Sequence, residues 1–162
     1  AIRTTGEQGL RFKAEIHKAP QALETYTVKE YGILVKLADN ENDLAYFETT
    51  DYDNNHNAGG IGKGVAFFAA DENIDYRFSD NGITIQFTSV LINIDEAHYE
   101  TEFTYRSYVV FNDGVNDIIL YSAEATASIY YVATQIVESE YGNDLASAPE
   151  FVRNIINAVD GT

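Results

Sequence analysis

The sequence predicts an α+β fold that is mainly β, an antiparallel β-sandwich followed by a C-terminal helical hairpin. Residues 103–111 alternate strictly between the two faces of a strand, and Asn112-Asp113-Gly114 supplies a turn directly after them. After Ser122 the apolar period changes to that of a helix. We therefore expect a single domain over residues 1–162, with the sandwich in residues 1–122 and two packed helices in residues 123–162.

Two strands are expected near the start of the chain. Residues 1–5 precede a turn between Gly6 and Gly9, and residues 10–17 then alternate between apolar and polar side chains. Pro20 breaks any regular element in the next segment. The run YGILVKL at residues 31–37 is nearly continuously apolar, which predicts a central strand with both faces covered.

The middle of the chain carries weaker strand signals. A polar, glycine-bearing loop is expected up to residue 64. Asn81-Gly82 favours a tight hairpin turn, because this pair tolerates the positive φ angles that such turns require. The remaining strands are expected at residues 45–49, 65–70, 75–78, 83–93, 105–111 and 118–121.

The C-terminal segment has the signals of two helices. Ser128 or Thr126 can cap the first helix, and Gly142 stands where it should stop. Ser147-Ala148-Pro149-Glu150 has the spacing of a capping box with proline in the first turn, and Gly161 marks the end of the second helix. The apolar stripe of the first helix consists of Ile129, Val132, Ala133, Ile136 and Val137.

Charge and hydropathy exclude two classes of partner. The chain has 26 acidic residues against 10 Lys and Arg, which gives a formal net charge of −16. Such a charge repels phosphate backbones and anionic membrane surfaces, so we expect no nucleic-acid partner. No apolar run approaches the roughly 20 residues needed to cross a bilayer, so we expect no membrane insertion.

No constellation of catalytic residues stands out in the sequence. There is no cysteine to act as a nucleophile, and no GxSxG elbow. The histidines His17, His56 and His98 lack the spacing of a metal site. We therefore expect that the chain is not an enzyme and needs no cofactor. A glycan-active hydrolase stays as an alternative, because a single sequence does not reveal which carboxylates would form a catalytic pair.

One acidic loop is a candidate calcium site. Asp51, Asp53 and Asn55 place side-chain oxygens at alternate positions, and a curling loop can point such oxygens at one Ca²⁺ ion. An EF-hand is excluded, since His56 and Gly62 stand where that loop needs glycine and glutamate. The alternative is a solvated acidic turn.

Tyrosine and arginine side chains form a candidate binding surface. Sugars stack on aromatic rings through their C–H faces, while arginine hydrogen-bonds their hydroxyls. The alternative is that these tyrosines are cross-strand packing pairs that stabilise the sheet. The candidate ligand-binding residues are Tyr46, Tyr76, Arg77, Arg106 and Tyr108.

Three blocks of the sequence carry a family resemblance. They are GEQGLRFKAEI at residues 6–16, INIDEAHYETEFTYRSYVVFNDG at residues 92–114 and SIYYVATQIV at residues 128–137. In this order they resemble an accessory β-rich module of large secreted or surface multidomain proteins of anaerobic Gram-positive gut and rumen bacteria. Asp95 stands where that module has a proline, and Ala127 where it has an arginine. The resemblance implies an extracellular accessory domain near dockerin, immunoglobulin-like or carbohydrate-active domains, with no settled catalytic residues.

These observations lead to one expected function and two alternatives. We expect a non-catalytic, extracellular or cell-surface module of a larger protein that binds glycan, with a polysaccharide as its partner. The first alternative is a structural or protein-docking module that binds a neighbouring protein domain. An exposed apolar patch without a groove would favour it. The second alternative is the hydrolase.

Overall fold

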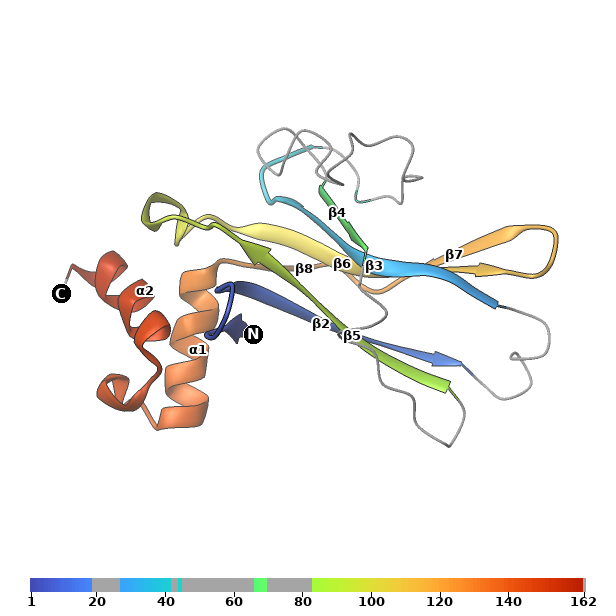
Figure 1. Ribbon diagram of the computed structural model, residues 1–162. Helices are drawn as coiled ribbons and strands as arrows, with labels where there is room; N and C mark the ends of the chain where they lie inside the picture. Colours follow the sequence, from blue (N-terminus) through green and yellow to red (C-terminus); the bar gives the residue numbers. More distant parts are fainter. Residues whose placement is uncertain (19–26, 42–43, 45–65, 70–82, 162) are drawn as a thin grey trace. The chain divides into compact units, whose positions relative to one another are not determined.

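A computed structural model describes residues 1–18, 27–41, 44, 66–69 and 83–161 (Figure 1). The expected strands at residues 45–49 and 75–78 lie outside the described residues, as does the expected turn at Asn81-Gly82. The expected loop before residue 64 also lies largely outside them, and the expected strand at residues 65–70 is described at residues 66–69. The other expected strands and both expected helices fall within the described part of the chain.

More residues lie in strands than in helices, and the paired strands are antiparallel, which confirms the expected α+β, mainly β class. The strands are β1 (Ile2–Arg3), β2 (Gly9–Lys18), β3 (Thr27–Leu37), β4 (Ala66–Ala69), β5 (Ile83–Ile92), β6 (Phe103–Asn112), β7 (Asp117–Tyr121) and β8 (Ala125–Ala127). The helices are α1 (Ile129–Tyr141) and α2 (Glu150–Asp160), with short 3-10 helices η4 (Glu96–His98) and η5 (Leu145–Ser147).

The strands form two sheets. The first is three-stranded, in the order β1-β2-β5, and the second is five-stranded, in the order β4-β3-β6-β7 with β8 also paired to β6. Ile2 lies opposite Leu10 in the first sheet, and Val110 lies opposite Ile119 in the second. Within the described strands, β7 therefore ends its sheet.

The chain divides into two compact units. The first holds Ala1–Phe12, Val90–Phe103 and Thr126–Thr162, and the second holds Lys13–Ser89 and Thr104–Ala125. The divisions fall within β2, β5 and β8 and after the first residue of β6. The expected single domain over residues 1–162 stays a prediction.

In the first unit, helix α1 has the boundaries that the sequence predicts. The hydroxyl of Ser128 accepts a hydrogen bond from the backbone N–H of Tyr131 at 3.0 Å, so Ser128 is the N-cap. Gly142 follows the helix with φ of 57°, in the left-handed region that suits glycine. Helices α1 and α2 lie side by side (Figure 1), and the Tyr130 hydroxyl of α1 donates to Asp160 of α2 at 2.8 Å.

The start of α2 differs from the expected capping box. Pro149 is the N-cap, with no side-chain cap hydrogen bond, and the Ser147 hydroxyl donates to the Asp144 carboxylate at 2.6 Å instead. The reason is local, because Ser147 is the last residue of η5 and is held in that turn. The amphipathic pattern still places the helix correctly, and its buried residues are Val152, Ile155 and Ile156.

A close approach of two backbones fixes the start of β2, also in the first unit. A Cβ atom added to Gly9 would lie 2.1 Å from the carbonyl oxygen of Leu91 and 3.1 Å from a side-chain carbon of Val90. No side chain fits at that distance. Gly9 is therefore required by the packing of β2 against this segment of the chain.

In the second unit, β3 and β6 carry the buried apolar residues. Tyr31 to Val35 are buried without interruption, which confirms the expected central strand with both faces covered. In β6, however, Tyr108, Val109 and Val110 are buried consecutively. The side chains still alternate between the two faces of the strand, but both faces are covered at these three residues, so this part of β6 has no exposed face.

Candidate functional site

The turn between β6 and β7 is held by side-chain oxygens. Asp113 accepts the backbone N–H of Val115 at 2.9 Å and that of Asn116 at 2.7 Å, and Gly114 donates to the Asn112 side chain at 2.8 Å. Gly114 has φ of 100°, which favours glycine. The expected turn at Asn112-Asp113-Gly114 is confirmed.

These bonds make the turn sensitive to pH. The backbone N–H groups of Asn116 and then Val115 lower the pKa of Asp113, since they stabilise its charged form. A lowered pKa adds stability above the ordinary pKa of the group, and that stability is lost as the pH falls through the lowered value.

Asp113→Ala is therefore expected to lower the melting temperature at pH 7, and the difference from wild type should shrink below about pH 4. Thermal melts of the two proteins at several pH values measure it. Glu124→Ala, which removes the same charge from an exposed residue of the second unit, is the control. A difference that stays constant down to the lowest pH would contradict the assigned role of Asp113.

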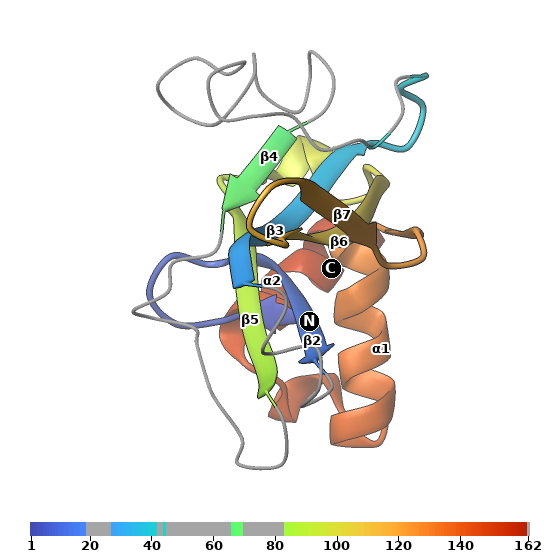
Figure 2. The ribbon, with the colours of Figure 1, turned by 90° about the vertical axis from the view of Figure 1, so that its right-hand side faces the viewer.

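Strand β7 and the turn before it expose large apolar side chains. The exposed fractions are 86% for Val115, 55% for Leu120, 39% for Tyr121, 37% for Ile118 and 36% for Ile119. Figure 2 shows β7 beside β6. Among the described strands, only β6 pairs with β7, so its other side is an edge. We call Val115 and Ile118 to Tyr121 the β7 edge.

The β7 edge lacks the features that usually protect edge strands. Such strands often carry lysine, proline or inward-pointing charges that prevent pairing with another chain. Between residues 118 and 121 there is no charge and no proline. The one charged residue of β7 is Asp117, and Lys29 neutralises it at 2.7 Å, while the Asn112 amide donates to it at 2.8 Å. These two groups, Lys29 first, lower the pKa of Asp117.

Arg106 lies against the β7 edge. Its guanidinium carbon is 3.9 Å from the centroid of the Tyr121 ring, a cation–π contact, and its Nη2 donates to the carbonyl oxygen of Leu44. Tyr108 lies opposite Tyr121, so Arg106 and Tyr121 are diagonal neighbours. The hairpin register would have revealed this contact from sequence, because the turn length sets which residues are opposite.

Two of the predicted ligand-binding residues, Arg106 and Tyr108, lie within the described part of the chain, both on β6. Tyr108 is 2% exposed, so its ring has no face for a ligand, and its expected place on an exposed surface is wrong. Burial on both faces of β6 is the reason. Arg106 is half-buried and engaged with Leu44 and Tyr121. The other predicted site residues lie outside the described residues: Tyr46, Tyr76 and Arg77 for sugar, and Asp51, Asp53 and Asn55 for calcium.

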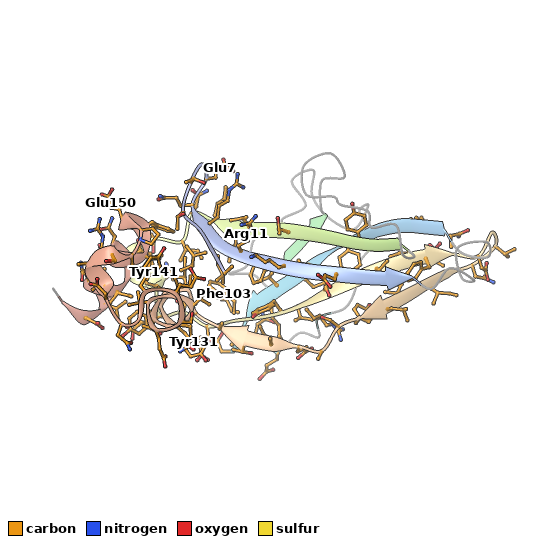
Figure 3. The ribbon with its side chains drawn as sticks, turned by 90° about the horizontal axis from the view of Figure 1, so that it is seen from below. Glu7, Arg11, Phe103, Tyr131, Tyr141 and Glu150 are labelled. Atoms are coloured by element: carbon orange, nitrogen blue, oxygen red, sulfur yellow. The ribbon has the colours of Figure 1, made fainter. Side chains whose placement is uncertain are left out.

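Other surface features of the described chain are isolated. Tyr131 is 55% exposed on α1. Tyr141, at the end of the same helix, is labelled with it in Figure 3. In the described residues, no group of three or more acidic or histidine side chains is placed to hold a metal ion. None of the helices described is long and apolar enough to cross a membrane. The calcium site stays a prediction.

No family model, curated protein or solved structure matches the chain. The resemblance to accessory modules of secreted bacterial proteins therefore depends on the three sequence blocks at residues 6–16, 92–114 and 128–137. The class that the structure defines is an antiparallel α+β chain with an apolar edge strand.

Proposed function

We propose that this chain is a non-catalytic docking module of a larger extracellular or cell-surface protein, and that a protein partner binds at the β7 edge. The observation that carries the proposal is the exposure of four consecutive apolar residues, 118 to 121, on an edge strand. The location and the larger parent protein are supported by the sequence resemblance alone. The β-sandwich likewise stays our expectation for the two sheets.

The chemistry of an edge strand favours a protein strand as the partner. An added strand gains backbone hydrogen bonds along the edge, and its alternate side chains contact those of the edge strand. Both faces of β7 are exposed, so an added strand can place apolar side chains beside Ile118 and Leu120 on one face and beside Ile119 on the other. Covering these side chains removes apolar surface from water.

The hydrogen bonds at both ends of β7 show which backbone groups face outward. Asp113 N–H donates to Asn116 at 3.1 Å, and Ser122 N–H donates to Ser107 at 3.0 Å. Hydrogen-bonded pairs alternate along an antiparallel ladder, so the pairs between these two involve Ile118 and Leu120. The backbone groups of Asp117 and Ile119 consequently point to the edge.

A short synthetic peptide of alternating valine and threonine, with lysine at both ends, is expected to bind the β7 edge. Binding should slow hydrogen exchange of the Ile119 amide at least several-fold, because that N–H becomes hydrogen-bonded. Exchange measured by NMR with and without peptide, in low salt and at a protein concentration at which the chain is monomeric, checks it.

The matched control is the same peptide N-methylated at consecutive residues, which removes the donors on both of its edges. It should leave the exchange rate unchanged. Equal effects of both peptides would mean that the side chains bind without strand pairing, and no effect of either would remove the docking proposal.

A glycan-binding role is the second candidate, and the Arg106–Tyr121 pair is the observation that favours it. Tyr121 is 39% exposed and the guanidinium of Arg106 lies over its ring, so an aromatic group and a cation that could contact a polysaccharide lie together. A glycan array with and without calcium tests this role and the loop of Asp51, Asp53 and Asn55 together. The role would be supported if Tyr121→Ala abolished glycan binding without changing the melting temperature. An array without any bound glycan would leave protein docking as the proposed function. Nothing among the described residues favours the hydrolase.

A further inference from the structure

We propose that the partner at the β7 edge is a second copy of this chain, paired through an antiparallel β7–β7 contact around a two-fold axis at Ile119. This inference depends on the proposed docking function and names its partner. It follows from the register, the charges and the length of β7.

The backbone of β7 is self-complementary in this register. A two-fold axis at Ile119 places Ile119 opposite the partner's Ile119, and it places Asp117 opposite the partner's Tyr121. The same alternation turns the backbone groups of Tyr121, like those of Asp117 and Ile119, to the edge, so the hydrogen-bonding positions of the two copies coincide. A register shifted by one residue would turn one copy's side chains to the other face of the sheet.

The side chains agree with the same register. Ile118 lies opposite the partner's Leu120, so apolar side chains meet on that face. On the other face, each Asp117 comes beside the partner's Tyr121, whose ring is covered by Arg106 at 3.9 Å. A carboxylate therefore lies near a guanidinium, and no two carboxylates of β7 face each other.

The overall charge opposes this contact at long range. Each copy carries a formal charge of −16, and added salt screens repulsion between exposed charges. A pair of strands as short as β7 is also smaller than the interfaces of stable dimers. We therefore expect a reversible dimer that salt strengthens, whereas a partner with a basic strand would bind more weakly as salt rises.

Sedimentation velocity over a range of protein concentrations tests the inference. The dimer association constant should rise several-fold when NaCl is raised from about 50 mM to about 500 mM. Ile119→Pro should abolish the dimer, because it removes the N–H at the two-fold axis while sparing the hydrogen bonds between β6 and β7. Ile119→Thr keeps the backbone and the β-branched shape, so it should retain the dimer. Tyr131→Ala, which removes an exposed ring elsewhere, should leave the association constant unchanged.

The outcomes separate this inference from the docking function. A monomer under all conditions, or a dimer that weakens with salt, would overturn the second copy as partner. So would a dimer that persists in Ile119→Pro, or one lost equally in Ile119→Thr. If the valine–threonine peptide still binds a monomeric protein, the docking function stands and the partner is a different chain. If the peptide dissociates the dimer, the peptide and the second copy bind the same β7 edge, which is the result we expect. Melting curves of each variant check that it is folded.

Discussion

Tyr108→Ala is expected to lower the free energy of unfolding by about 3–5 kcal/mol, the range for removing a large buried ring. Tyr108 is 2% exposed and lies in a buried run with Val109 and Val110. Removing its ring leaves a cavity between residues that cannot collapse freely into it. Since a domain of this size has a total stability of about 5–15 kcal/mol, the loss is a large fraction of it. Urea unfolding of the variant and the wild type measures the difference.

Tyr121→Ala is the matched control on the opposite strand. Tyr121 is 39% exposed, and its contact with Arg106 is a cation–π interaction at a partly exposed site, so the expected cost is about 1 kcal/mol. Equal costs for the two variants would contradict the burial of Tyr108. The comparison also decides how a binding experiment is interpreted. If Tyr108→Ala bound less polysaccharide, the reason would be lost packing and not a lost contact with the ligand.

Gly9→Ala is expected to cost about 3 kcal/mol of unfolding free energy. Its new Cβ would lie 2.1 Å from the Leu91 carbonyl oxygen, and a backbone atom cannot rotate away as a side chain can. The strand at Gly9 must therefore move away from Leu91, which weakens the packing in the first unit. Urea unfolding of the variant measures this cost.

Gly142→Ala separates this clash from ordinary backbone strain. Gly142 has φ of 57°, and nothing lies within 4 Å of a Cβ added there. Its replacement should cost only about 1 kcal/mol, the strain of a left-handed alanine. If Gly9→Ala were no more costly than Gly142→Ala, the close approach to Leu91 would not limit the fold.

Local signals predicted the elements that local chemistry determines. The cap at Ser128, the stop at Gly142 and the turn at Asn112-Asp113-Gly114 each depend on neighbours within a few residues, and each is confirmed. The continuous apolar run at residues 31–37 likewise predicted a strand buried on both faces. Such features do not depend on how distant segments pack.

Features that depend on distant segments were missed. The short strand β8 has no sequence pattern of its own and exists because it pairs with β6. The alternation along residues 103–111 gave no sign that Tyr108 is buried, because burial on both faces depends on what covers the second face. One local feature was missed as well: Ser147 was assigned to the wrong helix cap, because its hydroxyl donates to Asp144, only three residues before it.

The β7 edge could have been noticed from sequence, although its exposure could not. Residues 118–121 are four apolar side chains without alternation, which is unusual for a strand with one solvated face. A continuous apolar run normally indicates a strand covered on both faces, as in β3. Only the order of the described strands, which ends at β7, shows that this run lies on an edge.

The ion pair between Lys29 and Asp117 joins residues 88 positions apart in the chain. Asp117 is the only residue of β7 with a charge that could repel an incoming strand, and the cation that cancels this charge comes from β3. The charge that an incoming strand meets at this end of β7 thus depends on a lysine of another strand. Acetylation of that lysine, or a substitution there, would restore a full negative charge beside Ile118 without altering any residue of β7.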